Sequence, residues 1–199
     1  MTSPFPAFAI PPTSSVPFKP AVLIHRVLTV SGAPAGLAFQ SLALDRPIDP
    51  TFGIEAYVKG LAGHASSGGT PPKPPVDGGP EQTPFDIEVV EQCYVVVELD
   101  LAVNWRFREG SMGISTKFDF GDSNFGLTFV DETSGVHQGK VPTDCRLLYF
   151  SVAERRPPSR QGFNFDMVFQ FASTDPQVTR WLPVLFDPDI PSSGGSSFP

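Results

Sequence analysis

Residues 87–107, IEVVEQCYVVVELDLAVNWRF, decide the fold of this chain. Apolar side chains occupy nearly every odd position of the stretch, whereas the even positions carry most of its polar ones. Alternation with a period of two predicts half-buried β structure whose odd positions face the core. Because the stretch is several times longer than an ordinary strand, we expect two strands, or one that bends and passes between two sheets. The break is expected near Glu91, the one charged residue on the odd face, or at residues 98–100.

The remaining sequence has the composition of a β protein with long loops. Its 199 residues include 23 Pro, 18 Gly and 18 Phe. Proline and glycine interrupt helices and form turns, while phenylalanine favours packed strands. No segment predicts a helix. Further strands are predicted at residues 21–30, 36–45, 53–60, 111–120, 124–131, 145–153, 163–172 and 178–186. About eight to ten strands at this spacing predict an all-β fold, an antiparallel β-sandwich of the jelly-roll or immunoglobulin-like kind.

Both ends of the chain differ in composition from its middle. Residues 1–20 form a predicted arm rich in proline and phenylalanine, residues 187–199 a predicted tail, and residues 21–186 a single domain. A Pro/Gly-rich loop is predicted inside the domain at residues 61–85, longer than most structureless loops. Phenylalanine is unusual in an inert spacer, so we expect the arm and tail to bind other copies of the chain or a partner protein. The residues expected to do so are Phe5, Phe8, Phe18 and Phe198.

The charge balance excludes several classes of partner. The chain has 21 acidic and 14 basic residues, a formal net charge of −7. An acidic chain repels phosphate backbones, so nucleic acid is not expected as a partner. No apolar run approaches the ~18 residues of a membrane span, and no secretory signal is visible, so we expect a cytoplasmic protein without membrane insertion. The two cysteines, Cys93 and Cys145, are expected to be buried, reduced thiols.

The turn around residues 119–124 contains possible oxygen ligands for a metal. Asp119, Asp122 and Asn124 could bind Ca²⁺, but the same residue types are what a tight turn between strands requires. The turn is the favoured interpretation, so no metal site is predicted. The three histidines, His25, His64 and His137, lack further ligands at metal spacing. We interpret them as one hydrogen-bonded strand histidine and two solvated loop histidines.

A possible ligand face lies on the even positions of the 87–107 stretch. Tyr94, Asn104 and Arg106 would share one side of a sheet, and aromatic, amide and guanidinium groups together are typical of a sugar-binding surface. An ordinary solvated sheet face contains the same groups. Binding of a carbohydrate or another small ligand is therefore kept as the alternative function.

No catalytic motif is visible along the chain. The sequence contains no GxSxG, GxGxxG, phosphate-binding P-loop or HExxH motif. We therefore predict a protein that is not an enzyme, needs no cofactor, and acts as a structural or interaction subunit that assembles through its arm and tail.

Two segments, VVVELDLAVNWRF (95–107) and LPVLFDPDI (182–190), resemble a known group of proteins. The chain is similar to small uncharacterised β proteins of proteobacteria that carry the label "nucleotide synthetase". The resemblance covers about the last 115 residues. It implies a strand-rich fold and supplies no established activity or site residues.

Overall fold

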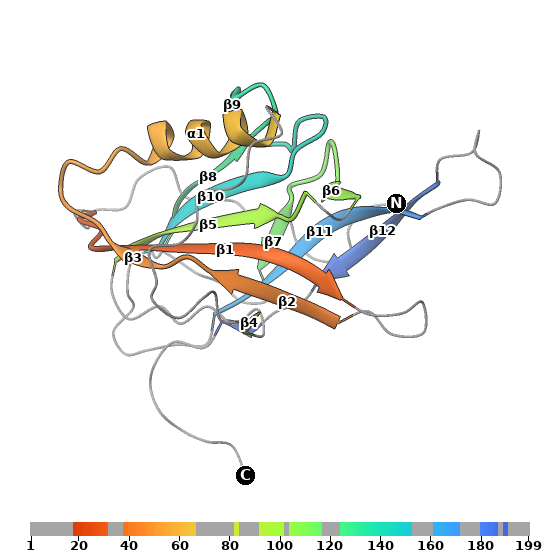
Figure 1. The fold of residues 1–199 in the computed structure, drawn as a ribbon, viewed down its shortest axis with the longest axis horizontal. Helices are drawn as coiled ribbons and strands as arrows, with labels where there is room; N and C mark the ends of the chain where they lie inside the picture. Colours follow the sequence, from red (N-terminus) through yellow and green to blue (C-terminus); the bar gives the residue numbers. More distant parts are fainter. Residues whose placement is uncertain are drawn as a thin grey trace, which may run out of the picture.

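The computed structural model describes residues 18–31, 38–66, 82–83, 92–101, 104–116, 124–152, 161–171, 180–186 and 189–190. These residues form two β-sheets and one helix (Figure 1). The protein is thus built mostly of strands, as its composition predicts.

The larger sheet is mixed rather than antiparallel. Its main path runs in the order β4 (Gln82–Thr83), β2 (Ala38–Ala43), β1 (Val22–Ser31), β5 (Cys93–Leu99), β10 (Leu147–Val152), β8 (Asn124–Val130) and β9 (Val136–Gln138), and β3 (Arg46–Pro47) pairs with β1. All of these pairs are antiparallel except β1 and β5, which run parallel at the centre. The prediction of a purely antiparallel arrangement is therefore wrong. The jelly-roll or immunoglobulin-like sandwich stays a prediction.

The smaller sheet is organised around one long strand. Four strands pair with β11 (Gln161–Phe171), all antiparallel: β12 (Arg180–Phe186), β13 (Asp189–Ile190), β6 (Trp105–Phe107) and β7 (Ile114–Thr116). Pro183 of β12 lies opposite Val168 of β11. Because proline cannot donate a ladder hydrogen bond, it suits β12, which is the end strand in the order of this sheet.

The alternating stretch that defines the fold does pass from one sheet to the other. Its first part is β5 in the larger sheet and its last part is β6 in the smaller one, with the break after Leu99. At this corner the Trp105 indole nitrogen donates a hydrogen bond of 2.9 Å to the Asp100 carbonyl. Leu101, inside the corner, is 43% exposed, whereas Trp105 is fully buried. Among the described odd positions of this corner, the buried pattern is thus interrupted at Leu101 and present again at Trp105.

A helix replaces one predicted strand. Helix α1 covers Ile54–Ser66, where we expected a strand at 53–60 and the beginning of a loop at 61–85. Val58, Leu61 and Ala62 are buried at the spacing of one helical face. The short apolar run and the glycines at positions 60 and 63 mimic a strand followed by a loop in the sequence. Among the described residues, no helix is long and apolar enough to cross a membrane.

Two hydrophobic clusters cover the two faces of the larger sheet. The inter-sheet core joins that sheet to residues of β6 and β7, and its members are Ile24, Leu28, Cys93, Val95, Val97, Leu99, Trp105, Phe107, Ile114, Leu127, Phe129, Val141, Cys145, Leu148, Phe150 and Val152. The helix-face core joins the opposite face to α1, and its members are Leu23, Val58, Leu61, Ala62, Val96, Val130, Leu147 and Tyr149. Both cysteines are buried and unbridged, as predicted.

Candidate functional site

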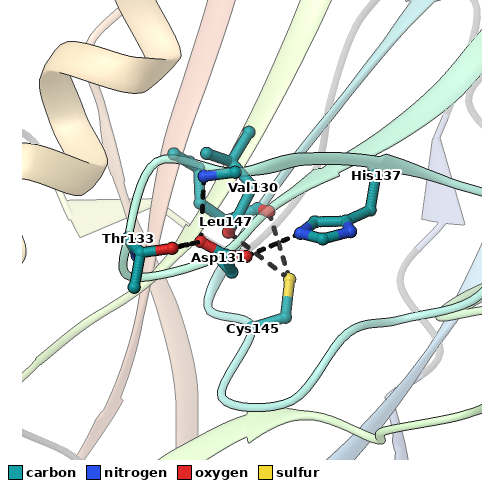
Figure 2. Close-up of polar contacts among 7 residues, drawn as sticks. Val130, Asp131, Thr133, His137, Cys145 and Leu147 are labelled. Carbon is teal, nitrogen blue, oxygen red and sulfur yellow. Dashed lines mark hydrogen bonds and ion pairs between the residues drawn. The ribbon is translucent and has the colours of Figure 1, made fainter.

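An aspartate–histidine pair lies where β8 turns into β9. Asp131 follows the last residue of β8, and His137 is the middle residue of β9. The Asp131 Oδ2 atom lies 2.6 Å from the His137 Nε2 atom (Figure 2). The histidine side chain is 41% exposed and the aspartate side chain 19%. The pair therefore presents an imidazole to solvent while the carboxylate that holds it is largely covered.

The turn between the two strands fixes the carboxylate. Asp131 Oδ1 accepts hydrogen bonds from the Thr133 amide (2.8 Å), the Thr133 hydroxyl (2.7 Å) and the Gly135 amide (2.9 Å). Burial raises the pKa of Asp131, but these hydrogen bonds and the one from His137 outweigh it and lower the pKa to about 2. At neutral pH the carboxylate is ionised and orients His137 through its Nε2 atom. The other ring nitrogen, Nδ1, is not the one that contacts Asp131.

Glycine is needed at position 135 because the pair occupies the space next to it. A Cβ atom there would lie 2.6 Å from Asp131 Oδ2 and 3.0 Å from His137 Nε2. Ser134, just before it, has a positive φ of 66°. The Ser134 hydroxyl donates a hydrogen bond of 3.2 Å to the Lys59 carbonyl of α1. The helix therefore helps to hold the turn in place.

Cys145 lies beside this pair but does not complete a nucleophilic triad. Its thiol donates to the carbonyls of Leu147 (3.3 Å) and Val130 (3.6 Å), as Figure 2 shows. The residue is fully buried, and burial raises the pKa of the thiol to about 12. A thiol that stays protonated and bonded to the backbone is a poor nucleophile, so Cys145 has a structural role.

A small pocket opens next to the pair, at the carboxyl-terminal end of β5. The side chains of Glu98, Asp131, Glu132 and Arg146 border it together with the α1 residues Leu61 and Ala62, and its accessible wall is almost entirely apolar. Its volume of about 20 Å³ holds one water-sized group. Arg146 also forms an ion pair with Glu132, with Nε and Oε1 separated by 3.4 Å. The pocket therefore presents an apolar wall to a bound group, and charged side chains border it close to the aspartate–histidine pair.

The residues of the expected ligand face do not lie together. Tyr94 belongs to β5 of the larger sheet, whereas Arg106 belongs to β6 of the smaller one. Arg106 forms an ion pair with Asp144. Asn104 is exposed at the corner between the sheets. The three side chains thus share no sheet face, because the chain changes sheet between Tyr94 and Asn104.

The other predicted site residues are only partly covered by the structure. Phe18 packs edge-to-face against Tyr94, with ring centroids 5.2 Å apart, so its described contact is within its own chain. Asn124 begins β8, and its side chain is not among those described. Within the described part of the chain, no three His, Cys, Asp or Glu side chains gather as a metal site would require. Five expected site residues lie outside the described residues: Phe5, Phe8, Asp119, Asp122 and Phe198.

Sequence reasoning missed the pair itself. His137 was expected to be a solvated loop histidine, but it lies in a strand and is held by Asp131. One signal was present: an aspartate followed by threonine two residues later and glycine four residues later is typical of an Asp-capped turn. His25, expected to be a hydrogen-bonded strand histidine, is indeed buried in β1 with both ring nitrogens bonded.

The comparisons with known proteins revise the functional prediction. The model of a family described as "Predicted novel nucleotide synthetase" matches residues 63–195, and no curated protein matches the chain. An enzyme-like family conflicts with the prediction of a non-catalytic structural protein, which is wrong, as is the prediction that the chain is not an enzyme. The carbohydrate-binding alternative gains no support. The absence of a contiguous catalytic motif misled us, because the turn after β8, and no known motif, brings the candidate pair Asp131 and His137 together. The match confirms the resemblance seen in the sequence, and the chain belongs to this predicted nucleotide synthetase family.

Proposed function

We propose that this chain is an enzyme that makes a nucleotide, with His137 as its general base and Asp131 as the residue that orients His137. One observation carries the proposal: the Asp131–His137 hydrogen bond lies within residues 63–195, which the family model matches, and beside a pocket. A carboxylate that holds an imidazole in one orientation is a recurrent arrangement for proton transfer.

The proposed reaction needs one proton acceptor next to the hydroxyl group that attacks the phosphorus. In the proposed step, His137 Nδ1 takes the proton of a hydroxyl on a nucleoside or nucleotide. The hydroxyl oxygen bonds to a phosphorus of a nucleoside triphosphate, and the bond from that phosphorus to the leaving phosphate group breaks. The proton then passes from the imidazolium to the leaving group or to water. Asp131 stabilises the imidazolium in between, because its lowered pKa keeps it ionised.

The test is a search for product with the purified full-length chain. The chain is incubated with Mg²⁺ and mixtures of nucleosides and nucleoside triphosphates, and new nucleotides are identified by liquid chromatography with mass spectrometry. We expect a product whose rate of formation falls about 10²- to 10⁴-fold in His137→Asn, the range for loss of a general base. Asp131→Asn should reduce the rate less, because the imidazole remains.

Gln138→Ala is the matched control, since Gln138 is exposed on the same short strand. It should keep the wild-type rate. Absence of a new nucleotide from every mixture would sink the proposal. An unchanged rate in His137→Asn would remove His137 from the mechanism.

A further inference from the structure

The small pocket beside the aspartate–histidine pair has no role in the proposed proton transfer, and its wall is apolar. The wall is formed by side chains of α1, β8, β10 and the end of β5 with the corner that follows it: Leu61, Ala62, Leu99, Leu101, Val130 and Leu147. All of them are buried except Leu101, which is 43% exposed. The wall is therefore held in place by the packed sheet and helix, and Leu101 is its solvent-exposed member.

The charged side chains that border the pocket have partners elsewhere. The Glu98 Oε2 atom lies 3.1 Å from the Nε2 atom of His25, which is fully buried in β1. Asp131 accepts hydrogen bonds within its own turn. The Arg146 Nε atom lies 3.4 Å from the Glu132 Oε1 atom. Each of these side chains thus interacts outside the apolar wall, and the wall that remains accessible is almost entirely apolar.

The size of the pocket selects a small apolar group. Its volume is about 20 Å³, which is the space of one water-sized group. A water molecule needs about two to four polar partners, and a buried hydroxyl also needs one, so an apolar wall suits neither. A methyl group is of similar size and gains free energy when it leaves water. The pocket therefore favours a methyl group over water, a hydroxyl or a phosphate.

Nucleotides carry few groups that meet these requirements. Their sugars and phosphates are polar, and the edges of their bases carry mainly hydrogen-bond donors and acceptors. The methyl group at C5 of a pyrimidine is an apolar group of the right size on the edge of a base. Asp131 both borders the pocket and holds His137, so a base bound here would lie beside the proposed general base.

We propose that this pocket binds the C5-methyl group of a pyrimidine nucleotide, so that the enzyme prefers a methylated pyrimidine to the same base without the methyl group. The inference rests on the proposed function, because it names the substrate class of the same site. Thymine and 5-methylcytosine share this methyl group, and the test distinguishes them.

Calorimetric titration with nucleotides that differ by one methyl group tests the inference without requiring turnover. The full-length chain is titrated with the triphosphates of thymidine and deoxyuridine, and with those of 5-methyldeoxycytidine and deoxycytidine. We expect the methylated member of at least one pair to bind about fivefold or more tighter, as burial of one methyl group supplies. A preference confined to one pair identifies the base, and a preference in both shows that the methyl group alone is recognised.

Two substitutions in the wall should change this preference in a graded way. Leu101→Ala removes the exposed part of the wall and should lower the preference by about twofold or more, because the methyl group loses part of its contact surface. Ala62→Val adds two methyl groups to the lining and should bring the preference to one or below, because the space is then filled. Both variants should still bind the unmethylated nucleotides.

Val136→Ala is the matched control. Val136 is also an exposed apolar side chain, at 36%, but it does not line the pocket. The control should keep the wild-type preference. Circular dichroism verifies that each variant is folded; if Ala62→Val fails to fold, Leu101→Ala decides.

The outcomes separate the two proposals. A wild type that binds and converts nucleotides without distinguishing methylated from unmethylated pyrimidines overturns the methyl pocket and leaves the proposed function standing. A preference that stays unchanged in both wall variants also overturns the pocket, because the methyl group then binds elsewhere. A wild type that neither binds nor converts any nucleotide overturns the proposed function, and the methyl pocket falls with it.

Discussion

The two faces of the larger sheet differ in chemistry although they are built from the same strands. On β5 the side chains directed to the inter-sheet core are Cys93, Val95, Val97 and Leu99, all apolar or thiol. The opposite face of that strand carries Tyr94, Val96 and Glu98. On β1 the helix face carries His25 between its apolar neighbours. On β5, one face thus carries apolar side chains and one thiol, whereas the other also carries a tyrosine and a carboxylate.

This difference explains where a site can form. A polar group in the inter-sheet core needs a partner within the protein, as the Trp105 indole and the Cys145 thiol have, because an unpaired one would cost about 1–3 kcal/mol. On the helix face, α1 covers the sheet incompletely and leaves the pocket near Glu98 and Asp131. Stability should therefore depend mainly on the first face, and activity on the second.

The largest effect on stability should come from removing a large side chain from the inter-sheet core. Phe129 on β8 is fully buried there, so Phe129→Ala should lower the free energy of unfolding by about 3–5 kcal/mol. Thr128, its neighbour on the same strand, faces the other way and bonds to Tyr149. Thr128→Val should cost only about 1 kcal/mol. Urea denaturation of both variants measures the difference, and equal losses would contradict the division between the faces.

Adding a single methyl group to the same core should also destabilise the fold. Gly113 has a φ of 68°, and a Cβ atom there would lie 2.6 Å from Cε1 of Phe129 and 2.9 Å from Cγ2 of Val141. Gly113→Ala should therefore cost about 2–4 kcal/mol, from backbone strain together with overpacking.

Gly110→Ala is the matched control for this prediction. Gly110 has a similar φ of 72°, but nothing lies within 4 Å of the added Cβ atom. It should cost about 1 kcal/mol, the strain alone. Thermal unfolding of the two variants isolates the packing contribution, and equal shifts would mean that Phe129 yields to the added methyl group.

The same contrast explains how much the sequence could predict. The period-two pattern of β5 predicts the packing face directly, because burial depends only on which residues are apolar. Helix α1 was missed because Gly60 and Gly63 interrupt its pattern, and its helical state depends on the sheet surface that it covers.

The candidate site could not be predicted in this way, because its members depend on tertiary pairing. His25 and Glu98 are 73 residues apart and meet only through the parallel register of β1 and β5. Nothing in a local pattern encodes that register. Asp131 and His137 are six residues apart, but they face each other only because the turn between β8 and β9 closes around the aspartate.

The smallest predicted effect is a dependence of stability on pH. It comes from Asp131 in the turn of the candidate site, and it distinguishes that turn from both hydrophobic cores. Asp131 has a pKa of about 2 in the folded chain, below the value of about 3.9 in an unfolded one. The folded state thus binds fewer protons between about pH 4 and pH 2, so this group stabilises the fold above that window and loses its contribution as the pH falls through it. Because the site is partly solvated, the loss should be on the order of 1 kcal/mol.

Urea denaturation at several pH values between 5 and about 2 measures this dependence, a range set by the two pKa values. Asp131→Asn should flatten the stability curve in the window, and Thr133→Val, which removes one hydrogen bond to the carboxylate, should flatten it in part. Parallel curves for the wild type and Asp131→Asn would show that the carboxylate is not specially stabilised in the fold. Phe129→Ala should lower the whole curve without changing its slope, because an apolar side chain exchanges no protons. The pH slope therefore reports the turn beside the pocket, while the height of the curve reports the inter-sheet core.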